Sequence, residues 1–153
     1  MKKILFIPFF VLFIFGCTGS IASHNDFSTF PYKGISNFDA NKALVCIYRP
    51  WHFLSCGSLP FVFKDEQIIG VLKNGSYFLE ESDPGQYSYY IELGGAIGGK
   101  VRISVLMELE SGERYFIVYR NRLERLVQVS QNLAMTEIEG LKYTEIKKKT
   151  YSK

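Results

Sequence analysis

Three residues with the chemistry to hold a metal or attack a substrate lie close together in the chain. Cys46, His52 and Cys56 follow one another as Cys-x5-His-x3-Cys. Thiolates and imidazoles are zinc ligands, and a Cys–His pair can act as a nucleophile and its base. The sequence contains neither Cys-x2-Cys nor His-Glu-x-x-His, and it has two histidines in all. We therefore predict no metal site and no cofactor, with an enzyme that uses Cys46 or Cys56 with His52 as the alternative.

The same two cysteines have a second chemistry. Paired cysteines in an oxidising, exported compartment commonly form a disulfide. A bond between Cys46 and Cys56 would close a loop over residues 47–55, for which chain entropy gives a stabilisation of about 3 kcal/mol. Two buried thiols are the other interpretation, and the sequence leaves both open.

A loop rich in binding side chains separates these cysteines. Arg49, Trp51, His52 and Phe53 follow a predicted strand and include the single Trp of the chain. Trp and Arg are enriched at binding hot spots. Large aromatic residues more often close the end of a core, so we favour a core position for Trp51 and treat a partner-binding loop as the alternative.

Carboxylates give a further candidate for catalysis. Glu80 and Glu81 are adjacent in a predicted strand, where neighbouring side chains point to opposite faces. The glycine-rich residues 94–99 lack the spacing of a phosphate-binding loop and precede a strand rather than a helix. Because no catalytic constellation emerges, we predict that the protein is not an enzyme.

The first residues of the chain predict export. Lys2 and Lys3 precede twelve apolar residues, 4–15, which is typical of a secretory signal. Twelve helical residues span about 18 Å, whereas the hydrocarbon core of a bilayer measures about 30 Å. We therefore predict a cleaved signal peptide at residues 1–16 rather than a permanent membrane helix.

The end of this apolar run resembles the lipobox of bacterial lipoproteins. An aliphatic residue, Ile14, stands three positions before Cys17, and Gly16 directly precedes it. The resemblance implies that Cys17 receives lipid, that the signal is cut before it, and that acyl chains such as palmitate anchor the protein. Two or three chains give stable anchoring, since each buried CH₂ contributes about 0.8 kcal/mol. Cleavage after Ala22, which would release a soluble protein, is the alternative.

The rest of the chain divides into a tether and one domain. Residues 17–41 show no sustained period and are rich in Ser, Asn and Gly, so we predict a tether, part of which packs along the domain. Residues 42–150 are predicted to form a single domain. Without the signal peptide, sixteen basic residues face fifteen acidic ones, and this near-neutral charge gives no case for nucleic-acid binding.

Short β-type segments separated by turns fill this domain. We predict an all-β fold, an antiparallel sandwich or partly open barrel. The Asn74-Gly75 pair predicts a hairpin between its flanking strands, and Thr136 followed by Glu139 predicts the start of a short C-terminal helix. The predicted strands comprise residues 43–48, 61–63, 67–72, 77–79, 86–93, 100–110, 115–119 and 126–129.

Several of these segments together resemble a known family. The pieces ALVCIYRP (43–50), LKNGSYF (72–78) and Asp83-Pro84-Gly85 are similar to those of small bacterial lipoproteins of the DUF2846 family. The strand and turn rhythm is more loosely similar to PEGA and transthyretin-like modules. The resemblance implies a lipid-anchored β-domain without an assigned activity.

Taken together, these patterns predict a non-enzymatic envelope lipoprotein. We expect the membrane itself to be one partner, through the lipid on Cys17, and an envelope protein or glycan to be the second. The absence of Asp directly after Cys17 resembles the enterobacterial pattern for outer-membrane sorting. The sequence therefore predicts a position on the outer membrane, facing the periplasm.

Overall fold

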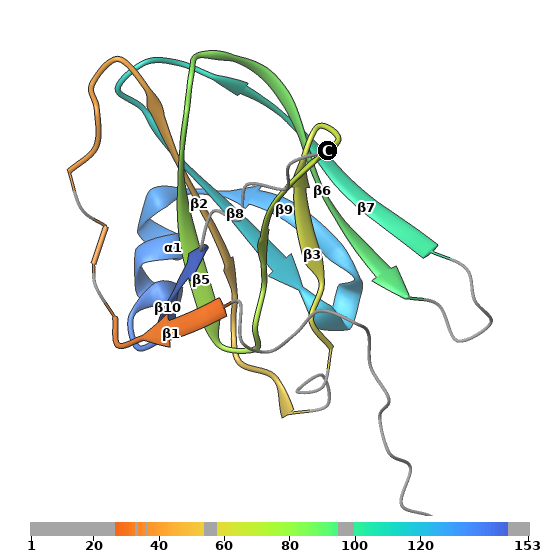
Figure 1. Cartoon of the computed structure of the whole chain (residues 1–153). Coiled ribbons are helices and arrows are strands. Elements are labelled where there is room, and N and C mark those ends of the chain that lie inside the picture. The colour runs from red at the N-terminus through yellow and green to blue at the C-terminus, as the bar shows by residue number, and fades with distance from the viewer. Residues whose placement is uncertain (1–26, 33, 36, 54–57, 95–99, 147–153) are drawn as a thin grey trace, which may run out of the picture.

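The computed structural model describes residues 27–32, 34–35, 37–53, 58–94 and 100–146 (Figure 1). The predicted signal peptide, the predicted lipidation site Cys17 and the cysteine Cys56 lie outside these residues. In the described part of the chain, no helix has the length and apolar character needed to span a membrane.

Within the described ranges, ten strands form two sheets, as an all-β sandwich prediction requires. The larger sheet is mixed and has the order β1-β10-β5-β2-β8-β9. The smaller sheet is antiparallel and has the order β4-β3-β6-β7. The strands are β1 (Phe27–Phe30), β2 (Ala43–Arg49), β3 (Phe61–Lys64), β4 (Gln67–Val71), β5 (Ser76–Ser82), β6 (Gly85–Gly94), β7 (Lys100–Leu109), β8 (Arg114–Arg120), β9 (Arg125–Val129) and β10 (Lys142–Ile146).

The main core lies between the two sheets. Alternate residues of β2, Ala43, Val45 and Ile47, pack there and are fully buried. Tyr89 and Ile91 of β6 belong to the same cluster. A period of two residues places these side chains on one face of each strand, which confirms the predicted sandwich.

A second cluster covers the opposite face of the larger sheet. Cys46 and Tyr48, which alternate with these residues in β2, point away from the sandwich core and pack near the helix α1 (Gln131–Ile138). The buried residues of α1 are Ala134 and Ile138. They are four positions apart and therefore lie on one side of the helix. In Figure 1, α1 accordingly lies on the side of β2 and β8 that faces away from β3 and β6.

Part of the predicted tether packs against this second face. Strand β1 pairs antiparallel with β10, with Phe30 opposite Tyr143. The ring of Tyr32 lies 5.8 Å from that of Tyr77, centroid to centroid, and the Tyr77 hydroxyl contacts the carbonyl of Gly34. The described chain is therefore held against the larger sheet from Phe27 onward.

The predicted hairpin at Asn74-Gly75 is wrong. Strands β4 and β5 belong to different sheets, so the turn carries the chain from one layer of the sandwich to the other. Gly75 has a φ of +69°, whereas Asn74 does not have a positive φ. A two-residue type I′ hairpin turn requires positive φ at both positions.

The helix is confirmed as a short C-terminal helix, but its predicted position is wrong. It ends at Ile138, soon after the residue Thr136 that we predicted to begin it. The Thr136 hydroxyl donates to the carbonyl of Asn132 within the helix instead of capping its start. The residues predicted to continue the helix form β10, which pairs with β1 and β5.

The direction of the strands defines two ends of the sandwich. At the loop end, β2 and β8 finish while β5 and β10 begin, with Arg49 opposite Ser76 and Ser76 opposite Lys142. At the far end, β2 begins and β5 finishes, with Ala43 opposite Ser82. The loop end is the lower end of Figure 1, where the chain leaves β2.

Candidate functional site

The loop that follows β2 is built on a buried arginine. Arg49 is 0% exposed, although arginine is among the residues that are least often fully buried. Its guanidinium donates to the carbonyls of Ser58 and Leu72, at 2.7 and 3.0 Å, and to the Ser58 hydroxyl at 2.9 Å. These contacts fasten both the loop after β2 and the end of β4 to one side chain.

A second clamp holds the middle of the loop. The Asn74 side chain accepts a hydrogen bond from the His52 amide at 2.8 Å and donates one to the His52 carbonyl at 3.0 Å. Next to it, the backbone of Gly75 lies against Trp51, so that an added Cβ would stand 3.3 Å from the Trp51 Cβ. The Asn-Gly pair therefore positions the loop rather than forming a hairpin.

Two aromatic side chains project from this fastened loop. Trp51 is 64% exposed and Phe53 is 73% exposed. Their ring centroids are 6.3 Å apart. The prediction that Trp51 closes the core is therefore wrong, because most of its side chain is open to solvent and Arg49 is the fully buried side chain at this end of β2.

Cys46 is a free cysteine and is 1% exposed. Of the two interpretations left open, a disulfide or buried thiols, the structure shows a buried thiol at Cys46. Cys56 lies outside the described residues, so its pairing remains a prediction. Burial raises the pKa of the Cys46 thiol, which keeps it protonated and poorly nucleophilic.

The two groups proposed for Cys–His catalysis are not brought together at Cys46. From Cys46 to Arg49, β2 rises about 10 Å, at roughly 3.3 Å per residue, and His52 follows three positions later in the loop. The His52 side chain is half-buried, and its Nδ1 has no hydrogen-bond partner among the described residues. The geometry gives no support to a nucleophile at Cys46.

The predicted separation of the two adjacent carboxylates is confirmed. Glu80 points between the sheets and lies 3.6 Å from the Nζ of Lys64, while Glu81 is exposed. The Lys64 Nζ also donates to the Ser82 hydroxyl at 2.9 Å, and that hydroxyl lies 3.2 Å from the buried Tyr89 hydroxyl. This far-end cluster links the two sheets and is closed to solvent at Ser82 and Tyr89.

A matching polar cluster fastens the helix to the larger sheet. The Tyr48 hydroxyl donates to Glu137 at 2.6 Å, and Arg120 donates to both oxygens of the same carboxylate at 2.7 and 2.8 Å. Burial, followed by the hydrogen bond to Glu137, raises the pKa of Tyr48. We interpret this cluster as structural, since each of its groups has a partner within the protein.

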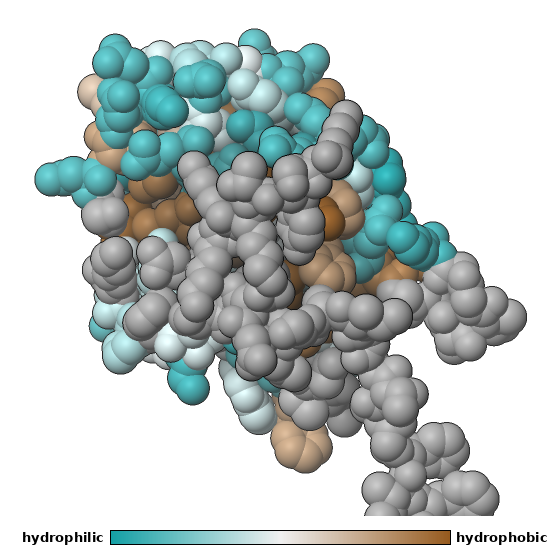
Figure 2. Space-filling model, viewed as in Figure 1, coloured by the Kyte–Doolittle hydropathy of each residue, from teal (hydrophilic) through white to brown (hydrophobic). Residues whose placement is uncertain are grey.

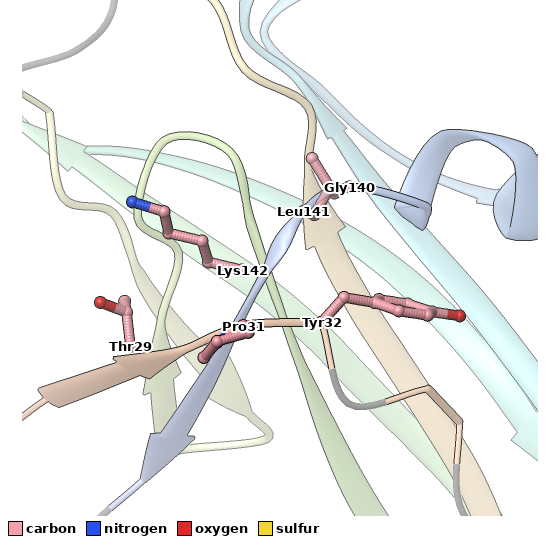
Figure 3. A pocket seen from close by; sticks show the side chains of 6 residues that line it. All are labelled: Thr29, Pro31, Tyr32, Gly140, Leu141 and Lys142. Carbon is pink, nitrogen blue, oxygen red and sulfur yellow. The ribbon is translucent and has the colours of Figure 1, made fainter.

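One surface hollow lies beside β1 and has a volume of about 500 Å³ (Figure 3). In Figure 3 the Tyr32 side chain points away from those of Thr29 and Lys142. A second hollow, of about 300 Å³, also borders Tyr32. Polar side chains that point in different directions cannot orient one ligand in the hollow beside β1. Within the described ranges, no group of three or more His, Cys, Asp or Glu side chains could hold a metal ion.

The functional residues that sequence reasoning missed are the supports of the loop. Asn74 holds His52 from a distant segment, and Ser58, farther along the same loop, pairs its hydroxyl with Arg49. Asn74 carried a signal, because Asn-Gly marks a turn. Ser58 carried none, since the pairing of its hydroxyl with Arg49 depends on tertiary structure.

The architecture is therefore a two-sheet β-sandwich with one helix on the outer face of the larger sheet, and its most distinctive surface feature is an aromatic loop. A family model of proteins of unknown function, DUF2846, matches residues 39–132. Because this match covers more than half of the chain, the chain belongs to the DUF2846 family. No curated protein matches it.

Proposed function

We propose that this protein is a lipid-anchored module of the bacterial cell envelope that binds another envelope component through the loop formed by Arg49, Trp51, His52 and Phe53 and catalyses no reaction. Lipid on Cys17 would hold it at the membrane, with the outer membrane as the expected site and the domain facing the periplasm. The sandwich would present the loop beyond the end of β2.

The observation that carries this proposal is the exposure of Trp51 and Phe53 on a fastened backbone. Exposed aromatic residues of this size are costly to solubility, and clusters of them mark interaction sites. Because Arg49 and Asn74 already order the loop, binding would cost little additional conformational entropy.

The anchor can be tested on the native protein. Mass spectrometry of its N-terminal peptide should show a chain that begins at Cys17 with diacylglyceryl and acyl groups attached. A chain that begins after Ala22 would contradict the anchor. As a second arm, Cys17→Ser should remove the protein from carbonate-washed membranes.

The loop can be tested separately in intact cells. With Phe53 replaced by a photoreactive phenylalanine, irradiation should attach an envelope component to the protein, and the mass of the adduct identifies its class. The same replacement at Leu106, which is 65% exposed on the outer face of the smaller sheet, serves as the control. Equal adducts at both positions, or none at position 53, would contradict a binding role for the loop.

A further inference from the structure

Charged side chains are distributed unequally between the two ends of the sandwich. Among the described residues that flank the strands beginning or finishing at the far end, two basic side chains, Lys42 and Arg114, are exposed against eight exposed acidic ones. The upper part of Figure 2, which shows this end, is mostly hydrophilic. The eight are Asp39, Asp65, Glu66, Glu81, Asp83, Glu108, Glu110 and Glu113.

The loop end has the opposite charge. Among its described residues, the exposed basic side chains are Lys100, Arg122, Arg125 and Lys142, while the exposed acidic ones are Glu124 and Glu139. Lys142 is adjacent to the loop, because its amide donates to the carbonyl of Gly75, which lies against Trp51.

The loop end also exposes apolar side chains. Leu123, in the short 3-10 helix Asn121–Leu123 that follows β8, is 63% exposed. It joins Trp51 and Phe53 at the end where β2 and β8 finish. Aromatic and apolar side chains beside basic ones match the interface of an anionic bilayer, where Trp lies at the headgroup level.

The length of the chain before β1 limits where the domain can go. Phe27, the first residue of β1, follows Cys17 by ten positions. Ten extended residues reach at most about 35 Å. Strand β1 runs toward the loop end, since Phe30 lies opposite Tyr143 and Tyr143 opposite Tyr77, the second residue of β5. The chain from Cys17 thus joins the domain at Phe27, about 10 Å from Phe30 along the strand at roughly 3.3 Å per residue, and its reach would let either end of the sandwich meet the bilayer. The charge and the aromatic side chains of the two ends, rather than this length, select the loop end.

We propose that the loop end is a membrane-docking surface for anionic phospholipid, with Trp51 and Phe53 inserted among the headgroups and the surrounding Lys and Arg side chains against the phosphates. This inference rests on the proposed lipid anchor and names the component that the loop binds. The acidic far end is repelled by the same surface, so the domain docks in one orientation.

The single Trp of the chain makes this orientation measurable. The native lipidated protein is reconstituted into vesicles of phosphatidylethanolamine and phosphatidylglycerol, with or without bromine on the acyl chains near the headgroups. Bromine quenches an indole only on close approach. Docking predicts a loss of Trp51 fluorescence in brominated vesicles and an emission maximum at shorter wavelength than in detergent; equal emission in both vesicle types overturns the inference.

Charge reversal provides the matched control. Arg122→Glu with Arg125→Glu should reduce the docked fraction, by about five-fold in the ratio of docked to undocked protein for each charge removed. Arg114→Glu, the same change at the far end, should leave quenching unchanged or increase it. Equal quenching in all variants, or in vesicles without phosphatidylglycerol, contradicts docking on anionic lipid.

The failures of the two proposals are distinguishable. Lipidated protein whose Trp51 is not quenched overturns the docking surface and leaves the envelope anchor intact. An unmodified Cys17, established by mass spectrometry on the same sample, overturns the anchor. A protein or glycan adduct at position 53, instead of a phospholipid adduct, assigns the loop to another partner and also overturns the docking surface.

Discussion

The two ends of this sandwich solve the problem of buried polar groups in different ways. At the far end, Lys64, Glu80, Ser82 and Tyr89 contact one another between the sheets, and polar partners come from side chains. At the loop end, Arg49 is buried and donates to backbone carbonyls of neighbouring loops. The far end thus links strand to strand, whereas the loop end fixes the backbone of a loop.

This difference connects stability with function. A loop whose backbone carbonyls are hydrogen-bonded to a buried arginine can expose its aromatic side chains. The order of its backbone does not depend on the packing of those aromatic side chains. The side chains of Trp51 and Phe53 are then free to contact an external partner. The following predictions test whether the two ends differ in this way.

The largest effect is expected from Arg49. Replacing it in Arg49→Met leaves the carbonyls of Ser58 and Leu72 without their donor in a closed site, and we expect a loss of about 3–5 kcal/mol in the free energy of unfolding. Lys64→Met at the far end should cost less than half of that, because Lys64 keeps 16% of its side chain exposed. Urea unfolding of both variants measures the difference, and equal losses would remove the distinction between the ends.

Asn74 should give the next largest effect. Asn74→Ala removes both hydrogen bonds to the His52 backbone, at a cost of about 2 kcal/mol. The matched change Asn41→Ala, in an exposed turn at the far end where Asn41 bonds to Asp39, should cost under about 0.5 kcal/mol. Fluorescence anisotropy of Trp51 should fall for Asn74→Ala alone; an unchanged anisotropy would contradict the clamp.

One buried tyrosine near each end of the sandwich should make the free energy of unfolding depend on pH above pH 9. Burial raises the pKa of Tyr48 and of Tyr89 above the ordinary value of 10.0. The protonated form is therefore favoured in the folded state, and its contribution is present below pH 10 and lost as the pH rises. Each tyrosine should lower the free energy of unfolding by at most about 1.4 kcal/mol between pH 9 and pH 11. Tyr48→Phe and Tyr89→Phe should each flatten the measured slope, and slopes equal to the wild type would contradict the assignment.

The smallest effect on stability is expected from Phe53. Phe53→Ser removes a side chain that is 73% exposed, so the free energy of unfolding should change by less than about 0.5 kcal/mol. Its contact with phospholipid should nevertheless be lost. A large destabilisation would show that Phe53 packs in the folded domain instead of serving a partner.

The sequence predicted the parts of the fold that depend on local pattern. The alternation from Val101 to Leu109 identified β7, and its buried face ends in Met107 and Leu109. It missed β10, because residues 142–146 owe their strand conformation to pairing with β1 and β5, which lie far away in the sequence. The position of α1 was missed for a related reason, since the buried pair Ala134 and Ile138 is defined by the sheet beneath it.

The candidate site was half predictable. Composition alone selected the loop with Arg49, Trp51 and Phe53, but it could not show which of these side chains is buried. The structure buries the charged residue and exposes the aromatic ones, the reverse of the usual preference. That reversal follows from carbonyl groups of Ser58 and Leu72, whose positions depend on the folded chain.

The central claim is that the loop end faces the membrane and the far end faces away from it. A photoreactive phenylalanine placed at Phe53 or, in a second variant, at Glu113 of the far end tests this in living cells. The account predicts a phospholipid adduct at position 53 and none at position 113. A phospholipid adduct at position 113, or only protein and glycan adducts at position 53, would contradict it.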